Sequence, residues 1–206
     1  HKKIFEEAKK HNLEYFSSPF DETSVDFLNQ LEVKAYKIAS SEINHLPMIE
    51  KIVRLNKPII ISLGFANEDD LKNLKKLFKK YNFKKFIFLN CVSKYPAKFE
   101  DYSFIDHNKL SKKFLVGLSD HTNDNRASIT SLINGGVVFE KHIKLFKLKS
   151  IDSFFSSDYV QFKKYVEEIR LFHKVISSQN SNLKQNKDST NKRSIYVTNN
   201  VKKGDK

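Results

Sequence analysis

The chain has 206 residues, of which 39% are hydrophobic, enough to bury one sizeable core and to begin a second unit. A single cysteine, Cys91, excludes a disulfide framework and any multi-cysteine zinc site, and it favours the reducing cytoplasm. Apolar runs such as Ile59 to Ile61 are too short to span a bilayer, so we expect a soluble protein without a membrane partner.

The formal net charge of +13 raises the hypothesis of a basic protein that binds RNA or another anionic surface. About half of this charge lies after His173, and the rest is spread along helical polar faces such as residues 72–80. The aromatic residues fall at core spacing, whereas a nucleic-acid platform needs them exposed among Lys and Arg. We therefore favour a small anionic substrate, which a positive field attracts, and expect no nucleic-acid partner.

Short apolar runs alternate with amphipathic segments from the first residue onwards. A helix is expected over residues 1–11, a clear one from Asn67 to Tyr81 with Asn67 as its cap, and a long one over residues 158–177. Strands are expected at residues 15–19, 35–40, 58–63, 85–92, 114–119 and 136–142. Alternation of strand and helix predicts an α/β fold with a parallel sheet.

The expected strands begin about 20 to 30 residues apart, as in a TIM (β/α)8 barrel. Six strands do not close such a barrel and the chain opens inside a helix, so we expect about the first two strands to be missing. The barrel domain is expected over residues 1–177. Residues 178–193 are polar and predict a linker, and residues 194–206 resume a strand-like pattern, predicting the start of an incomplete second domain.

The active site of a barrel lies where its strands end, and the expected strand ends are unusually polar. In chain order they carry Ser17, Ser18 and Asp21; Lys37, Ser40 and Glu42; Ser62; Ser93 and Tyr95; Ser119, Asp120, His121 and Thr122; and Glu140, Lys141 and His142. A purely structural barrel has no need for Lys, Glu and two His on one rim, which favours a catalytic role.

His121 and His142 end neighbouring strands; Asp120 directly precedes His121, and Glu140 lies two residues before His142. Two imidazoles with oxygen ligands suit Mn²⁺, Mg²⁺, Fe²⁺ or Zn²⁺. The alternative is an ordinary histidine bonded to backbone at each position. Two such residues on adjacent strands favour the metal.

Three further side chains have two interpretations each. Lys37 interrupts an apolar strand, so it faces a phosphate or carboxylate ligand, or it pairs with Glu42 or Glu140. Glu42 is either a general acid or base, or a first-turn carboxylate of a helix. Cys91 would need a nearby base to act as a nucleophile, and a buried core cysteine is favoured. Glycine-rich nucleotide loops and the Gly-x-Ser-x-Gly elbow do not occur in the sequence, which disfavours those enzyme classes.

Six ordered motifs at these strand ends resemble the sialic acid synthases. They are Ser-Ser-Pro-Phe-Asp from Ser17, Tyr-Lys-Ile-Ala-Ser-Ser-Glu-Ile from Tyr36, Lys-Pro-Ile-Ile-Ile-Ser-Leu-Gly from Lys57, Asn-Cys-Val-Ser-Lys-Tyr-Pro from Asn90, Gly-Leu-Ser-Asp-His-Thr from Gly117 and Glu-Lys-His from Glu140. The resemblance runs from Phe16 to Arg170, and residues 192–196 resemble the lead into the family's C-terminal antifreeze-like (SAF) domain.

The resemblance implies a transferase of carbohydrate biosynthesis that condenses phosphoenolpyruvate with an N-acetylated amino-sugar aldehyde, giving a nine-carbon nonulosonic acid and phosphate. By position, Glu42 resembles the proton-transfer residue, and His121 and His142 resemble the ligands of a divalent metal, Mn²⁺ first, with Mg²⁺ or Co²⁺ as alternatives. Similar to the phosphoenolpyruvate contacts are Ser18, Lys37, Ser40, Ser93 and Ser119; similar to the sugar contacts are Tyr95, Glu140 and Asp152.

The acceptor sugar is suggested by the loop after the last strand. The run Asp152-Ser-Phe-Phe-Ser resembles pseudaminic acid synthases more than N-acetylneuraminate synthases, whose loop usually reads Asp-His-x-Ala-Ser. Departures from the family pattern include Ser18 where Thr is commoner and Leu63 where Thr is frequent. N-acetylneuraminate and legionaminate synthases, or another metal-dependent barrel aldolase, stay as alternatives.

The resemblance also implies parts that this chain does not contain. In the family, an acidic residue on the first strand and a lysine on the second complete the site. The SAF domain of a partner subunit reaches over it, in a domain-swapped homodimer. We therefore expect this polypeptide alone to be inactive, as measured by phosphate release.

Overall fold

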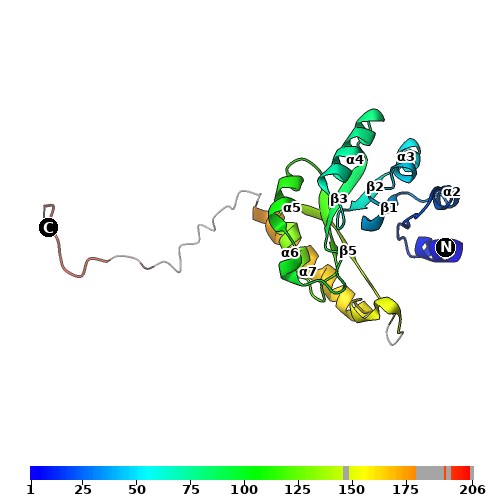
Figure 1. The fold of residues 1–206 in the computed structure, drawn as a ribbon. Helices are drawn as coiled ribbons and strands as arrows, with labels where there is room; N and C mark the ends of the chain where they lie inside the picture. The colour runs from blue at the N-terminus through cyan, green and yellow to red at the C-terminus, as the bar shows by residue number, and fades with distance from the viewer. Residues whose placement is uncertain (146–148, 180–192, 194–195, 205–206) are drawn as a thin grey trace.

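The computed structural model describes residues 1–145, 149–179, 193 and 196–204, and its centre is a parallel sheet of five strands. Each strand pairs with the next one in the chain, in the order β1-β2-β3-β4-β5, with the helices around the sheet (Figure 1). The strands are β1 (Tyr36–Ile38), β2 (Ile59–Ser62), β3 (Phe86–Cys91), β4 (Val116–Asp120) and β5 (Gly136–Lys141). This confirms the predicted α/β class, and the consecutive strand order is that of a (β/α) barrel.

Helices separate the strands and begin at local sequence signals. They are α1 (Lys2–Lys10), α2 (Glu22–Gln30), α3 (Leu46–Arg54), α4 (Glu68–Lys80), α5 (Phe104–Ser111), α6 (Arg126–Ile133) and α7 (Tyr159–Gln179), with 3₁₀ turns η1 (Ser40–Glu42), η2 (Phe99–Asp101) and η3 (Ile151–Phe154). Asn67 caps α4 as predicted, since its side chain accepts from the amides of Asp69 and Asp70.

The predicted strand over residues 15–19 is wrong. This segment makes a single parallel bridge, between Ser17 and Tyr36, and the Lys37 amide donates to Ser17 O at 3.2 Å. Pro19 has no amide hydrogen to extend the ladder, and Phe16 is 40% exposed, so the segment lies beside β1 without becoming a strand. The described residues therefore hold five of the six expected strands.

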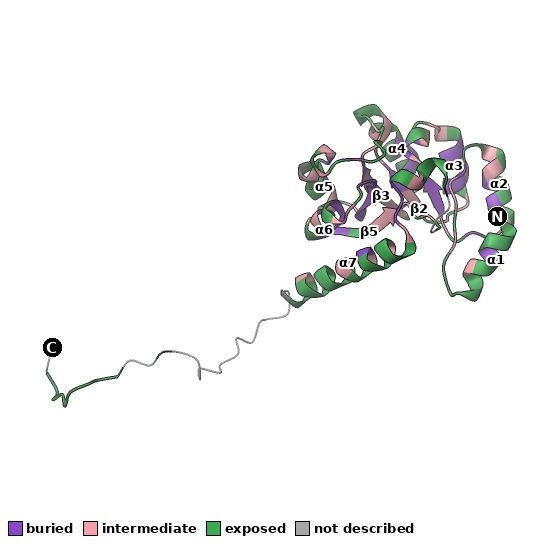
Figure 2. Cartoon of the chain, turned by 90° about the horizontal axis from the view of Figure 1, so that it is seen from below, coloured by how far each residue is buried: buried purple, intermediate pink, exposed green. Residues whose placement is uncertain are grey.

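The core lies between the strands and the inward faces of the helices (Figure 2). On α3, for example, Met48, Ile49 and Ile52 are fully buried at helical spacing. Burial of each such side chain contributes roughly 1.5–3 kcal/mol. A smaller cluster of Ala97, Tyr102, Leu118 and Ala127 packs under α6 and supports the carboxyl end of β4.

The predicted long helix after the last strand is confirmed as α7 and continues to Gln179. Ser178 and Gln179 of the predicted linker thus belong to α7, and residues 180–192 lie outside the described residues. Residues 196–204 of the predicted second domain form no helix or strand, and residues 194–195 and 205–206 lie outside the described part. None of the described helices combines the length and apolar character that a membrane span requires.

Candidate active site

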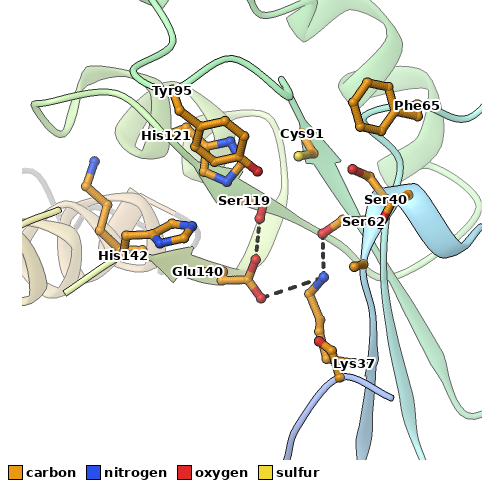
Figure 3. Close-up of a pocket in the computed structure, with 14 residues that line it drawn as sticks. Lys37, Ser40, Ser62, Phe65, Cys91, Tyr95, Ser119, His121, Glu140 and His142 are labelled. Atoms are coloured by element: carbon orange, nitrogen blue, oxygen red, sulfur yellow. Dashed lines mark hydrogen bonds and ion pairs between the residues drawn. The ribbon is translucent and has the colours of Figure 1, made fainter. Parts of the chain in front are cut away.

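The carboxyl ends of the strands surround a cavity of about 410 Å³ (Figure 3). Of the residues predicted for the site, those that line this cavity are Ser18, Lys37, Ser40, Tyr95, Ser119, His121, Glu140 and His142. They come from segments more than a hundred residues apart in the chain. The sheet therefore gathers most of the predicted site, as parallel strands in a barrel should.

A row of interacting polar side chains extends across the cavity from β1 to β5. The buried ammonium of Lys37 donates to Ser62 Oγ at 2.7 Å and to Ile38 O at 3.0 Å, and it lies 3.8 Å from Glu140 Oε2. The Ser119 hydroxyl donates to the other carboxylate oxygen of Glu140. Of the two acidic partners considered for Lys37, the structure thus selects Glu140.

The electrostatics of Lys37 are set mainly by its burial. Burial lowers the pKa of the Lys37 ammonium, and the neighbouring Glu140 carboxylate opposes that shift. A cation held in this way is stabilised by any further negative charge that enters the cavity. Lys37 is therefore suited to bind a phosphate or a carboxylate.

The two histidines lie on the other side of the cavity, with Tyr95 against them. Their ring centroids are 5.4 Å apart, and the Tyr95 ring lies 4.2 Å from that of His121. His121 Nδ1 lies 2.7 Å from Val92 O. Because a carbonyl only accepts, Nδ1 donates and carries the proton, which leaves the lone pair of Nε2 available.

This arrangement fits two protein ligands of a metal ion. Metal-binding histidines commonly donate their second nitrogen to a carbonyl, as His121 does, and burial lowers the pKa of His121, which favours the neutral ring that binds metals. No group of three or more His, Cys, Asp or Glu within the described ranges is arranged as a complete ligand set.

Three predicted site residues lie outside the lining. Ser93 contacts the lining residue Ser40, with its hydroxyl 3.1 Å from Ser40 Oγ. Glu42 ends η1, and its Oε2 lies 3.8 Å from His45 Nδ1. Asp152 lies in η3, where its Oδ2 is 3.9 Å from His142 Nδ1.

Asp152 borders a second cavity, of about 360 Å³, which shares residues with the first. Tyr95 and His142 line both cavities, and the second is completed by Ile151, Phe154 and Phe155. Phe155 packs on both shared rings, at 4.9 Å from Tyr95 and 4.8 Å from His142. An apolar wall thus adjoins the histidine side of the site.

Several lining residues received no role from the sequence. They are Ser41, Ser62, Phe65, Cys91 and Lys141. The strand-end position of Ser62 was the signal for it. Cys91 is buried as predicted, and burial raises the pKa of its thiol. The signal for Lys141 was its position between Glu140 and His142. Because side chains alternate along a strand, the side chain of Lys141 is directed to the face opposite to those of Glu140 and His142.

Comparison with known sequences gives one consistent family. The family model that matches is the NeuB family, over residues 1–181. The pseudaminic acid synthases of Campylobacter jejuni and Helicobacter pylori are 36% and 38% identical to this chain over its full length. An N,N'-diacetyllegionaminic acid synthase of Campylobacter jejuni is 33% identical. The chain spans 61% to 64% of the length of these relatives.

Solved structures agree with the sequence comparison. The sialic acid synthetase of Leptospira borgpetersenii matches 92% of this chain, and 66% of its own, with a TM-score of 0.82 at 26% identity. A truncated 3-deoxy-D-arabino-heptulosonate 7-phosphate synthase of Thermotoga maritima, at 14% identity and a TM-score of 0.71 over 85% of this chain and 73% of its own, shares the fold alone. With the family model covering nearly all of the described residues, the chain belongs to the NeuB family of sialic-acid-type synthases.

Proposed function

We propose that this chain forms the substrate-binding barrel wall of an enzyme that condenses phosphoenolpyruvate with an N-acetylated amino-sugar aldehyde. The products are a nine-carbon nonulosonic acid and phosphate. One observation carries the proposal: a buried lysine among serines and a pair of histidines face the same cavity. Membership of the NeuB family supports it.

Phosphoenolpyruvate would occupy the lysine side of the cavity. Lys37 is suited to its negative charges, and the serine hydroxyls supply hydrogen bonds without adding charge. Ser18, Ser40 and Ser119 line the same cavity, and Ser93 supports Ser40 from behind. We assign these four serines to the phosphoenolpyruvate side.

The aldehyde would lie against the histidine side. A divalent ion bound by His121 and His142, which we propose to be Mn²⁺, would supply Lewis-acid polarisation of the aldehyde oxygen. Within the chain, the Val92 carbonyl holds the His121 ring in the tautomer that this role needs. The Tyr95 ring packs against the His121 ring, with 4.2 Å between their centroids.

The proposed reaction needs neither an oxidant nor a reductant. The methylene carbon of phosphoenolpyruvate bonds to the aldehyde carbon, and the aldehyde oxygen takes up a proton to become a hydroxyl. Water then adds to the cationic carbon, releases a proton, and phosphate leaves by C–O cleavage to give the keto acid. We assign the proton transfer to Glu42, which lies two residues after Ser40 on η1, next to the cavity lining.

The sugar would be recognised at the apolar wall beside the histidines. Acetamido methyl groups can pack on Phe155 and Tyr95, while the carboxylates of Glu140 and Asp152 accept from sugar hydroxyls. The two pseudaminic acid synthases are more similar to this chain than the N-acetylneuraminate-9-phosphate synthase of Homo sapiens, at 29%. We therefore propose a pseudaminic-type acceptor, with legionaminic and N-acetylneuraminic types as alternatives.

We also propose that the full-length protein works in the cytoplasm as a domain-swapped homodimer, with the partner's SAF domain over the site. The support for this is the family resemblance. To identify the acceptor sugar, the full-length protein should be assayed with a panel of hexoses that carry one or two acetamido groups. Phosphate release is the measurement.

Binding of phosphoenolpyruvate to this chain tests the proposal directly. Calorimetry should show binding that Lys37→Met weakens at least about tenfold, equivalent to about 1.4 kcal/mol. Lys51 is the matched control, because it pairs with Asp26 and neither residue lines the cavity, so Lys51→Met should leave the affinity unchanged. Binding that does not depend on Lys37, or no binding to the folded chain, would contradict the assignment.

A further inference from the structure

A buried ion pair joins β4 to β5 directly behind the cavity. Asp120 and Lys141 are register partners at the carboxyl ends of these strands, and Lys141 Nζ lies 3.2 Å from Asp120 Oδ2. Their side chains are 0% and 2% exposed. They contact the helix layer: Ser128 of α6 bonds to Asp120, and the Tyr165 ring of α7 lies 5.3 Å from Lys141 Nζ.

Both charges of this pair are fully hydrogen-bonded. The carboxylate accepts from the amide and hydroxyl of Thr122 on one oxygen, and from Ser128 Oγ and Lys141 on the other. The ammonium also donates to Thr122 O at 2.6 Å and to Asp124 O at 2.9 Å. Lys141 therefore holds the loop that follows His121 through hydrogen bonds to two of its backbone carbonyls.

The neighbours of the pair in sequence face the opposite way. Side chains alternate along a strand, so the residues on either side of Asp120 and Lys141 are directed into the cavity. Before the pair come Ser119 and Glu140, which are register partners and bonded to each other. After it come His121 and His142, which line the same cavity. Along the strands, the ion pair thus lies between the Ser119–Glu140 pair and the His121–His142 pair, with its side chains on the other face.

The pairing of β4 with β5 is irregular at its other end. A register shift lies between Val116 and Gly117, where Gly117 approaches Val138 so closely that a Cβ would stand 2.0 Å from Val138 O. At this bulge the pairing passes over Val137, so the alignment of the two strands changes by one residue there. A slip of one residue would turn Glu140 and His142 away from the cavity.

We infer that the Asp120–Lys141 ion pair fixes the register of β4 against β5 and so positions His121 opposite His142 and Ser119 opposite Glu140. These are positioning residues: Asp120 does not line the cavity, and although Lys141 is a lining residue, its side chain is only 2% exposed and its ammonium is bonded to Asp120, Thr122 and Asp124. Buried ion pairs are weak sources of stability, and their best-attested use is to specify register. The part of the test below that measures Mn²⁺ binding rests on the proposed function, whereas the inference about strand register does not.

A mild variant with a close control tests the inference. Ser128 and Ser131 are both fully buried on α6, and Ser128 bonds to Asp120 whereas Ser131 bonds to His107 Nε2 at 3.2 Å. In the metal-free chain, the imidazole ¹⁵N resonances of His121 and His142 should broaden or split in Ser128→Ala. They should match the unmodified chain in Ser131→Ala. Mn²⁺ affinity should fall in Ser128→Ala only.

A second variant removes the pair without leaving a buried charge alone. Asp120→Leu with Lys141→Met should fold, with the far-ultraviolet spectrum of the unmodified chain, but should bind Mn²⁺ about tenfold more weakly or worse, the loss typical of ligand-orienting partners. Unchanged imidazole spectra in Ser128→Ala, or full Mn²⁺ affinity in the folded double variant, would overturn the inference. Changed spectra in a chain whose unmodified form binds no Mn²⁺ would support the register role and sink the metal proposal instead.

Discussion

The tautomer of His121 is the residue-scale feature that bears most directly on the proposed metal site. Its Nδ1 is fixed by the Val92 carbonyl, so the lone pair of Nε2 is presented without competition from the backbone. The sequence indicated two histidines on neighbouring strands, but no residue type or spacing indicates which nitrogen is free. That detail depends on a loop carbonyl, which only the folded chain supplies.

Removing both imidazoles should abolish metal binding. We expect the double variant His121→Ala, His142→Ala to lose Mn²⁺ affinity by at least about a hundredfold in a fluorescence or calorimetric titration, the upper end for loss of site geometry. His45→Ala is the control, because His45 does not line the cavity and its ring nitrogens lie 3.8 Å from Glu22 and Glu42. Equal affinity in the double variant and the unmodified chain would exclude a metal at these residues.

A different histidine should make the fold sensitive to acid. His107 is buried, its Nδ1 has no hydrogen-bond partner among the described residues, and burial lowers its pKa below 6.5. Because the unfolded chain binds this proton first, the free energy of unfolding should fall as the pH drops below 6.5 and level off once the folded state is protonated.

His107→Leu should therefore flatten the loss of stability on the acid side of pH 6.5 in urea titrations. The exposed His173 on α7 offers a control, and His173→Leu should keep the slope of the unmodified chain. An acid slope that survives in His107→Leu would mean that other groups cause it.

At the scale of elements, the sequence was most informative where a local signal decides the structure. Asn67 predicted the start of α4, and the capping box with Asp70 is present. Residues 15–19 show the converse: their apolar pattern suits a strand, but strand formation depends on hydrogen bonds with β1, and only one bridge forms. Pairing is non-local, so pattern alone does not determine it.

The same limit explains why the sequence did not reveal the partners of Lys141. Its position between Glu140 and His142 was visible, but its partners lie on β4 and in the following loop. Ser18, Lys37 and Ser119, by contrast, line one cavity as expected, because strand ends in a parallel sheet converge by topology.

The α4 cap gives a prediction at this scale. Asn67→Ala should lower the free energy of unfolding by about 1 kcal/mol, because two amides of the first helical turn lose their acceptor. Asn73 is exposed in the middle of the same helix, so Asn73→Ala should be neutral or slightly stabilising. Equal destabilisation by both changes in urea titrations would show that the cap has no special role.

At the scale of the whole molecule, the sheet brings two chemically different halves into one cavity. β1 and β2 contribute Lys37 and Ser62, while the ends of β4 and β5 lead to His121 and His142. Glu140 lies between them, bonded to Ser119 and close to Lys37.

This division of labour predicts separable ligand effects on thermal unfolding. Phosphoenolpyruvate at about 100 times its dissociation constant should stabilise the chain by about 2.7 kcal/mol, and so should Mn²⁺ at the same excess. Lys37→Met should remove the first effect and keep the second, while His121→Ala, His142→Ala should do the reverse. If either variant lost both effects while remaining folded, the cavity would act as a single site. Glu140, whose carboxylate lies 3.8 Å from Lys37 Nζ and acts electrostatically on His121, would then be the residue through which the two halves are coupled.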